Sequence, residues 1–291
     1  MRLTTVIGLA VALCALLALP APASAASRDL TSYRGLGAWI DVWDAYQWDH
    51  PGKTVDALHA QGVDTLYLET GNSGQRSYLF RPLQMAAFVR AAHFRHMKIV
   101  AWYLPTLTDL QKDRSRSVGA IRFRTDDGQR FDSFALDIES SDVKLISTRN
   151  ERLATLTHTV RLAAGQSMAL GAIIPSPRGM QLSPSYWPHF PYQALAAVYD
   201  VMLPMDYYTN RVSGEAAAQA YTEQNAQIVW AETGDPAFPI HMIGGGAAAS
   251  TRYEVRGFAT AVSGLGLLGG SLYDAATTRP GEWEELQPLS R

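Results

Sequence analysis

Cysteine is nearly absent from this 291-residue chain, which has only Cys14. Cys14 lies inside the apolar residues 6–19, which follow the positive charge of Arg2 and precede the small residues 23–25. This order is typical of a secretory signal peptide. We therefore expect residues 1–26 to be removed and the protein to be secreted or extracytoplasmic. Without Cys14, the mature chain has no disulfide, no cysteine-ligated metal and no cysteine nucleophile.

Long apolar runs are also lacking. Residues 6–19 form the longest, about 14 residues, whereas a helix needs about 20 to cross a bilayer. We therefore expect no membrane span once the signal peptide is removed.

Charge is sparse and nearly balanced. Charged residues make up 18% of the chain, and the formal net charge is −2. A protein that binds duplex nucleic acid needs a basic face to displace counterions from phosphate, and the Lys and Arg residues here are scattered. Nucleic acid is therefore not an expected partner. With 47% apolar residues, residues 27–291 suit one large globular domain.

What the sequence does contain is a repeated alternation. Short apolar runs rich in β-branched and aromatic residues are each followed by a stretch with helical apolar spacing. The strand candidates are residues 37–42, 63–69, 98–104, 133–139, 168–174, 198–206, 239–243 and 267–273. The helical stretches include residues 82–94, 150–164, 215–231 and 253–263. Eight such units in about 250 residues predict an α/β fold, a single-domain (β/α)8 TIM barrel.

An open doubly wound sheet is the alternative fold. It usually carries a glycine-rich phosphate turn after its first strand, whereas residues 43–48 here are WDAYQW. The three glycines at 244–246 match no phosphate fingerprint and are expected to form a tight strand-to-helix turn. Two insertions are also expected at the mouth: a β-hairpin over residues 120–135 that turns at Asp127-Gly128, and a long proline-stiffened loop over residues 175–188.

Carboxylates gather at the ends of the candidate strands, where a barrel of this kind builds its active site. They are Asp41, Glu69, Asp137, Glu139, Asp206 and Asp274. Asp137 and Glu139 occupy positions i and i+2, so they point to the same face, about 6–7 Å apart at Cα. Two acids that close in a partly dry pocket do not both ionise easily. Glycoside cleavage needs such a pair, an acid for the leaving oxygen beside a charge that stabilises an oxocarbenium-like transition state.

The fourth strand resembles a known signature. Residues 132–139 (DSFALDIE) are similar to the Asp-x-x-Asp-x-Asp-x-Glu motif of the family 18 glycoside hydrolases, the chitinases and their relatives. The resemblance implies that Glu139 is the acid and that Asp137 helps to position the acetamido group of the substrate. Ala135 stands where the family has its middle Asp, and residues 205–208 (MDYY) only approximate its Met-x-Tyr-Asp.

A weaker resemblance is to the family 25 lysozymes. Residues 37–42 (GAWIDV) are similar to the first strand of that family, in which a catalytic-site Asp, here Asp41, is followed two residues later by Ser, here Trp43. Glycosidases with a nucleophilic Glu after strand seven are not matched, because residues 239–244 (PIHMIG) contain no Glu.

Aromatic residues accompany the acids. Indole and phenol rings offer flat apolar faces that stack on the C–H faces of sugars. Five of the seven tryptophans fall at or just after strand ends. Of these we expect Trp43, Trp102 and Trp187 to line the groove, and the others to pack in the core.

Metal chemistry is the main enzymatic alternative, because several carboxylates at one mouth could hold Mg²⁺ or Ca²⁺. The histidines offer no zinc site, since His93 and His96 lie in a helix remote from the mouth and the others are isolated. A Ser-His-Asp hydrolase is disfavoured, because no Gly-x-Ser-x-Gly turn follows a strand. We expect no metal and no cofactor.

The sequence thus predicts a secreted glycoside hydrolase-like barrel that cleaves a polysaccharide, with amino-sugar polymers among the candidates. The alternative is a non-catalytic carbohydrate-binding barrel, which Ala135 favours. The expected catalytic residues are Glu139, Asp137 and Asp206. The expected substrate-binding residues are Asp41, Trp43, Glu69, Trp102, Tyr103, Trp187, Tyr207, Tyr273 and Asp274. The sequence indicates no oligomeric state.

Overall fold

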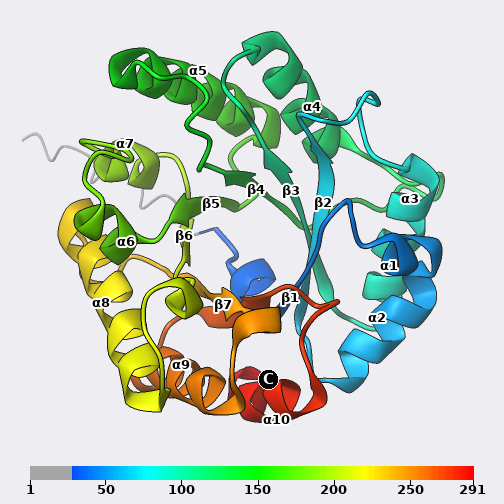
Figure 1. The fold of residues 1–291 in the computed structure, drawn as a ribbon. Coiled ribbons are helices and arrows are strands. Elements are labelled where there is room, and N and C mark those ends of the chain that lie inside the picture. The colour runs from blue at the N-terminus through cyan, green and yellow to red at the C-terminus, as the bar shows by residue number, and fades with distance from the viewer. Residues whose placement is uncertain (1–27) are drawn as a thin grey trace, which may run out of the picture.

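Residues 28–291, which a computed structural model describes, form a closed barrel of eight parallel strands surrounded by helices (Figure 1). The strands pair in chain order, and β8 closes against β1. They are β1 Gly35–Ile40, β2 Thr65–Asn72, β3 Lys98–Leu104, β4 Ser133–Asp137, β5 Leu170–Pro175, β6 Val201–Met205, β7 His241–Gly246 and β8 Gly269–Tyr273. The predicted (β/α)8 barrel is confirmed. The predicted signal peptide, residues 1–26, lies outside the described residues.

Helices cover the outside of the barrel (Figure 1). The α-helices are α1 Ala45–Asp49, α2 Pro51–Ala60, α3 Pro82–Phe94, α4 Leu110–Arg122, α5 Ile146–Ala164, α6 Pro177–Leu182, α7 Tyr192–Ala196, α8 Glu215–Thr233, α9 Arg252–Gly264 and α10 Pro280–Leu286. Short 3₁₀ helices are η1 Thr31–Tyr33, η2 Tyr208–Asn210, η3 Ala247–Ala249 and η4 Gln287–Leu289. Proline begins α2, α3, α6 and α10, where its missing N–H would have no helical partner.

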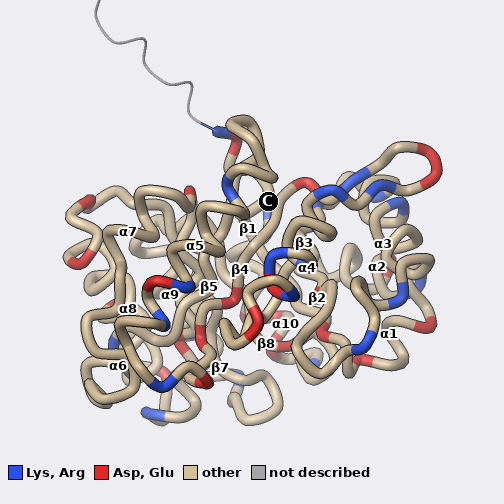
Figure 2. Tube along the Cα trace, turned by 90° about the horizontal axis from the view of Figure 1, so that it is seen from above, with Lys and Arg blue, Asp and Glu red and all other residues tan. Residues whose placement is uncertain are grey.

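Two further features bear on partners. Among residues 28–291, no helix has the length and apolar character that a bilayer crossing requires. Lys and Arg residues are spread over several elements and interspersed with Asp and Glu (Figure 2).

Two predicted segments differ from the structure. Residues 120–122 end helix α4, so the hairpin predicted over residues 120–135 is wrong. Its turn does form, since Thr125 N donates to the Gln129 carbonyl at 2.9 Å and Gly128 has a φ of +83°. The predicted loop over residues 175–188 contains the short helix α6.

The glycines at 244–246 were predicted to form a turn, and this is also wrong, because they complete strand β7. Close packing explains why glycine occupies these positions. A Cβ at Gly244 would lie 2.8 Å from the Leu272 side chain, and one at Gly245 would lie 2.7 Å from the Tyr208 ring. These glycines therefore allow neighbouring side chains to pack against the strand.

The inside of the barrel is filled by side chains from alternate strand positions, as in other barrels of this type. Trp39 and Tyr67 stack with their ring centroids 4.2 Å apart, and Trp102 meets Trp39 edge-on at 5.8 Å. Further buried members of this inner cluster are Val100, Ala135, Ile173, Leu203, Met205 and Ile243. The other strand face packs against the helices. The interior is therefore a packed core.

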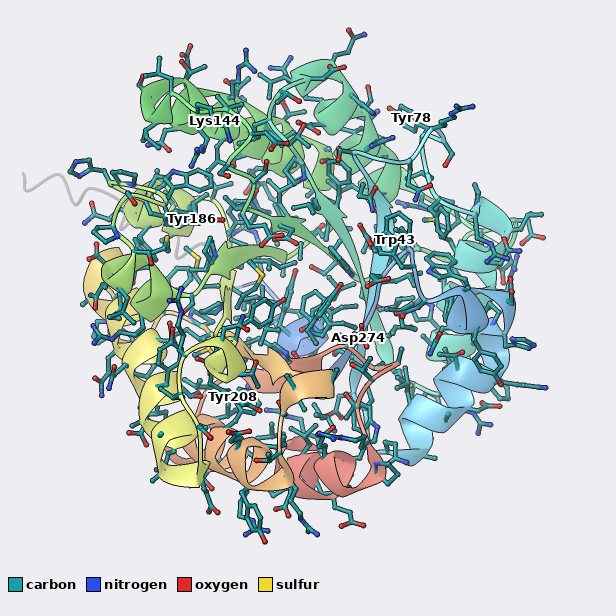
Figure 3. The ribbon with its side chains drawn as sticks, viewed as in Figure 1. Trp43, Tyr78, Lys144, Tyr186, Tyr208 and Asp274 are labelled. Atoms are coloured by element: carbon teal, nitrogen blue, oxygen red, sulfur yellow. The ribbon has the colours of Figure 1, made fainter. Side chains whose placement is uncertain are left out.

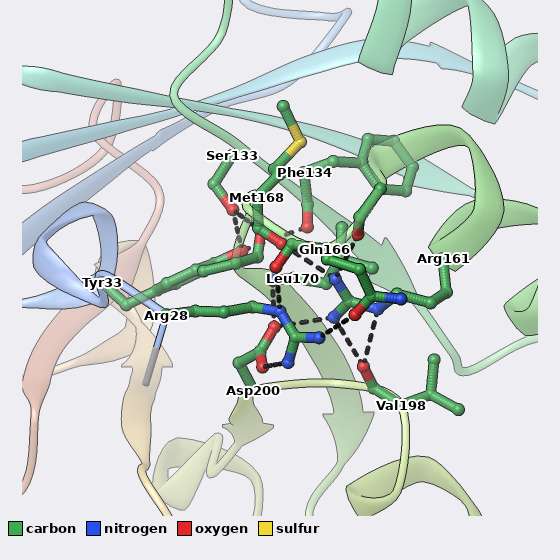
Figure 4. Close-up of polar contacts among 12 residues, drawn as sticks. Arg28, Tyr33, Ser133, Phe134, Arg161, Gln166, Met168, Leu170, Val198 and Asp200 are labelled. Carbon is green, nitrogen blue, oxygen red and sulfur yellow. Dashed lines mark hydrogen bonds and ion pairs between the residues drawn. The ribbon is translucent and has the colours of Figure 1, made fainter. Parts of the chain in front are cut away.

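The N-terminal end of the barrel is closed by η1, which lies within the ring of strands (Figure 1). Tyr33 Oη hydrogen-bonds Ser133 Oγ at 2.6 Å, at the start of β4. Next to it, Arg28 and Arg161 each pair with the Asp200 carboxylate at 2.7 Å (Figure 4). These contacts tie the first described residues to the base of the barrel.

A buried hydrogen-bond chain crosses the interior. His241 Nδ1 lies 2.9 Å from the Tyr33 carbonyl, and its Nε2 lies 2.9 Å from Ser271 Oγ. Burial lowers the pKa of His241 to about 4, so the ring is neutral at pH 7. A carbonyl only accepts, so Nδ1 carries the proton and Nε2 accepts from Ser271. Trp39 Nε1 then donates to Ser271 Oγ at 2.8 Å.

Replacing Ser271 with alanine tests this chain. Ser271→Ala leaves Trp39 Nε1 and His241 Nε2 buried without partners, so we expect the free energy of unfolding to fall by about 1–3 kcal/mol. Urea denaturation at pH 7 measures the change. The control is Ser263→Ala, an exposed position on α9, where a change within about 0.5 kcal/mol is expected. Equal effects in the two variants would contradict the role of Ser271.

Candidate active site

The predicted acid pair lies at the mouth of the barrel. Asp137 is the last residue of β4 and is 6% exposed, and Glu139 follows two residues later, half-buried. Burial is the first cause that raises the pKa of both groups. The neighbouring Glu139 and Glu69 raise the pKa of Asp137 further, to well above its usual range. Neither acid of the pair forms an ion pair with any described residue.

Two polar atoms at this site lack hydrogen-bond partners among the described residues. They are Asp137 Oδ1, an acceptor when ionised, and Trp102 Nε1, a donor, and both are buried. Ala135 is one reason why these two atoms lack partners. It pairs with Trp102 across β3 and β4 and lies two residues before Asp137 on the same strand face, yet it carries no polar group. Buried polar atoms are rarely left unpaired in proteins.

Glu69 lies at the same mouth, near the end of β2. Its Oε2 accepts a hydrogen bond from Val42 N at 2.9 Å. Burial raises the pKa of Glu69 to about 7, and the charges of Asp41 and Asp44 add to this, while the Val42 N–H acts in the opposite direction. Glu69 is therefore a second carboxyl that holds a proton near neutral pH.

Asp41 and Tyr273 meet across the junction of β1 and β8. Asp41 Oδ2 accepts from Tyr273 Oη at 2.8 Å, and its Oδ1 accepts from Trp43 N at 2.6 Å. Asp44, which was not predicted as a site residue, joins Asp41 and Asp274, because one oxygen from each lies within 4.8 Å of the others. Its position three residues after Asp41 in the same loop was the feature of the sequence that could have identified it.

These three carboxylates are the described residues that could hold a cation, since Ca²⁺ and Mg²⁺ prefer oxygen ligands. Protein donors already serve each of them: Asp44 accepts from Asp41 N at 3.0 Å, and Asp274 accepts from Thr277 N at 3.0 Å. Burial, followed by the charge of Asp41, raises the pKa of Asp44 to about 7. The cluster is therefore stabilised by hydrogen bonds and by a proton held near neutral pH.

Asp206 is placed differently from the prediction. It belongs to the wall of a cavity beside Glu139, yet its side chain is fully buried and faces helix α8. Thr222 Oγ1 and Asn225 Nδ2 donate to its two oxygens at 2.5 and 2.8 Å. Burial raises the pKa of Asp206 to about 7, against the effect of these two donors. We therefore correct the prediction that Asp206 is catalytic, because its carboxylate does not face the pair.

Tyr207, a predicted substrate-binding residue, faces the mouth. Burial is the main cause that raises its pKa, and the charges of Asp137, Glu139 and Asp274 add to it. Its ring lies 6.3 Å from that of Tyr273. Met205 and Tyr207 line a cavity of about 250 Å³ next to Glu139.

Of the predicted aromatic residues, Trp43 and Trp102 lie at the mouth. Trp43 is 73% exposed, whereas Trp102 is buried in the inner cluster. Tyr186, which was not among the predicted site residues, also lines the Glu139 cavity, and its Oη donates to the Glu139 carbonyl. Its place in the loop before β6 was the only feature of the sequence that could have identified it as a site residue.

The predictions that Trp187 lines the groove and that Tyr103 binds substrate are wrong. Trp187 is 3% exposed and packs on Phe190, with the Arg149 guanidinium 4.5 Å from its ring. Tyr103 follows Trp102 on β3 and so points to the opposite, helix-facing side, where its Oη donates to Asp113 at 2.6 Å. Both are core residues.

Asp132, the first acid of the family 18-like motif, lies at the other end of β4. It accepts hydrogen bonds from Ile99 N at 2.9 Å and from Lys98 Nζ at 3.1 Å, and it pairs with His93. Asp132 is therefore structural, and the motif brings only Asp137 and Glu139 to the mouth.

Comparison with solved structures relates the fold to glycosidases. The endo-beta-1,4-mannanase from Thermotoga petrophila matches 89% of this chain and 76% of its own, with a TM-score of 0.66 at 11% identity. The chitinase from Chromobacterium violaceum matches 89% of this chain and 99% of its own, with a TM-score of 0.62 at 13% identity. A family 18 N-acetylglucosaminidase from Paenibacillus barengoltzii matches 88% and 99%, with a TM-score of 0.59 at 10% identity.

No protein-family model and no curated protein matches the sequence. At these low identities the structural likeness concerns the fold alone. The chain therefore shares the (β/α)8 barrel fold of these glycosidases, which is the fold that its motifs implied.

The buried Asp206 makes a prediction about pH. Between its ordinary pKa of 3.8 and its native value of about 7, only the native state holds the proton. The stability it contributes is therefore complete below about pH 4 and is lost as the pH rises to 7. Asp206→Asn removes this titration, and Thr222 can reverse its hydrogen bond to accept from the new amide.

We expect the wild type to lose about 1.4 kcal/mol per pH unit more than Asp206→Asn between pH 5 and 7. Denaturant unfolding at several pH values measures this difference. The exposed Asp142→Asn variant is expected to follow the wild type. If the free energy of unfolding changed equally with pH in the wild type and in Asp206→Asn, Asp206 would be ionised in the native state at pH 5.

Proposed function

We propose that the protein is a secreted glycoside hydrolase that cleaves a polysaccharide, with Glu139 as its general acid. The observation that carries this proposal is the acid pair at the mouth, with raised pKa values and no ion-pairing partner in residues 28–291. A general acid must hold its proton at the working pH. Burial has this effect on Glu139, which is the more exposed member of the pair and borders the cavity.

Asp137 is the deeper member of the pair, and we assign it the role of stabilising the developing positive charge on the sugar. Two interacting carboxyls titrate as a unit, so that one proton is shared between them over a range of pH. With one proton between them the pair carries one negative charge, on Asp137 while Glu139 holds the proton. When Glu139 gives this proton to the leaving oxygen, both carboxylates are negative as the sugar becomes positive. Such a transition state is typical of glycoside cleavage.

The aromatic rim of the mouth supports a chain of several sugars as the ligand. Trp43 and Tyr186 lie on opposite sides of the barrel axis (Figure 3), and both are exposed. A polysaccharide that stacks on both rings passes over the acid pair.

A non-catalytic carbohydrate-binding barrel is the second candidate. Ala135 favours it, because no carboxylate supports Asp137 from that position, and Asp206 faces away from the site. The two candidates differ in whether glycosidic bonds are broken, so one set of variants distinguishes the enzyme from the binding barrel.

The catalytic proposal predicts that Glu139→Gln lowers hydrolysis at least about 10²-fold, because the amide has no proton to transfer. Asp137→Asn is expected to lower kcat by a similar factor through lost charge stabilisation. The assay measures new reducing ends from chitin, mannan, peptidoglycan, and α- and β-glucans, at pH 5 to 8. Thermal melting of each variant confirms that it is folded.

Two outcomes would overturn the catalytic proposal. No release of reducing ends by either the wild type or Glu139→Gln on any polymer, with polymer binding retained, establishes the binding barrel instead. Full activity in Glu139→Gln on a polymer that the wild type cleaves moves the acid to another residue.

The exposed Trp43 ring predicts a binding effect. Trp43→Ala removes one stacking surface, so we expect affinity for the preferred polymer to weaken about tenfold, or about 1.4 kcal/mol. Unfolding stability is expected to stay the same, because the ring is 73% exposed. The control is Phe94→Ala, which removes an equally exposed ring at the C-terminus of α3, away from the mouth. Equal losses in the two variants would exclude a specific role for Trp43.

A further inference from the structure

The cavity beside Glu139 is a defined pocket. Its walls come from the β5–α6 segment, with Ser176 and Met180, and from the residues after β6, with Tyr207 and Arg211. Its volume of about 250 Å³ lies below the roughly 300–1,000 Å³ of pockets that hold drug-sized ligands. A space of this size suits one sugar ring with its substituents rather than several rings.

Arg211 gives this pocket an uncompensated positive charge. It lies in the wall and is exposed to solvent, and no described carboxylate is close enough to form an ion pair with it. Arg211 therefore borders the same cavity as Glu139 and Tyr207.

The two acids of the pocket do not neutralise this charge. The oxygens of Asp206 are held by Thr222 and Asn225 on α8. Glu139 has no ion pair, and burial favours its neutral form. Other polar wall groups are already bonded, since Ser176 Oγ bonds Tyr221 Oη at 3.0 Å and Asn225 Oδ1 at 2.9 Å. Arg211 is therefore the cationic group in the wall of this pocket, and its charge is available to an anion.

We infer that the pocket binds a sugar that carries a carboxylate, and that Arg211 determines this specificity by pairing with it. This inference rests on the proposed function, because it names the substrate class of the same site. Arginine offers a planar fork of donors that matches the two oxygens of a carboxylate. The carboxylate can belong to a uronic acid or to a lactyl ether on an amino sugar, and the two sources differ in the polymers that contain them.

Binding is tested first, with ligand pairs that differ only in the carboxylate. One pair is an oligouronate and its carboxyl-reduced counterpart. The other is peptide-free peptidoglycan glycan, which carries lactyl ethers, and chitin oligomers, which have the same backbone without them. Calorimetry with Glu139→Gln, in which turnover is blocked, measures each affinity. We expect the carboxylated member of at least one pair to bind about 10- to 100-fold more tightly.

Variants then assign the preference to Arg211. Arg211→Gln is expected to abolish it without weakening the neutral ligand, and Arg211→Lys is expected to retain part of it. The matched control is Arg178→Gln on α6, a neighbouring arginine that does not line the pocket and bonds Gln181 instead. This control is expected to keep the full preference, and raising the salt concentration is expected to reduce it.

Failure of the inference and failure of the proposed function give different results. Equal affinity within both ligand pairs, or a preference that survives Arg211→Gln, overturns the inference even if the protein hydrolyses a neutral polymer. A preference lost in Arg211→Gln, without hydrolysis of any polymer by the wild type, supports the inference and removes only the catalytic proposal.

Discussion

The chemistry of the mouth depends on the filling of the barrel beneath it. Trp39, Tyr67 and Trp102 pack across the interior, and η1 closes the far end. The carboxyls above them therefore lie on an apolar floor, with water on one side only. Desolvation is accordingly the first cause of the raised pKa values of Asp137 and Glu139. The raised pKa values of the two acids thus follow from core packing, and loosening that core would lower these pKa values as well as the stability.

The fold was predictable from the sequence because its strands are short apolar runs, and the predicted and observed strands agree in number and order. Helix α3 was predicted over its full length for the same reason. Helix α4 was missed because its buried face is largely polar. Asp113 and Arg116 are both buried there, the first bonded to Tyr103 and the second to backbone carbonyls of the loop after β2. A helix that packs largely through charged side chains contains few apolar residues, and an apolar run is the feature by which the other elements were identified.

The site was only partly predictable. Asp137 and Glu139 follow from i, i+2 spacing at the end of an apolar strand. Asp206 follows the last residue of β6, between Met205 and Tyr207, which both face the pocket. Asp206 stands one position away from each of these residues, and its side chain points to α8 instead. Side chains alternate between the two faces of a strand. If the predicted end of the strand is wrong by one residue, the side chain after it is predicted to point to the wrong face. Trp187 lies in a loop with no such alternation, so its burial depended on tertiary contacts.

Burying two acids side by side at the mouth costs stability, and this cost helps to decide between an enzyme and a binding module. Burying two neighbouring acids without a cation destabilises the folded state whenever they ionise, and amides of the same shape would avoid that penalty. A barrel that only holds neutral sugars obtains enough hydrogen bonds from amides and hydroxyls. An acid pair with raised pKa values gives one ability that amides lack, the transfer of a proton. The burial of Asp137 beside Glu139 therefore favours an enzyme over a binding module, and an anion-binding Arg211 is compatible with it because burial favours the neutral form of Glu139.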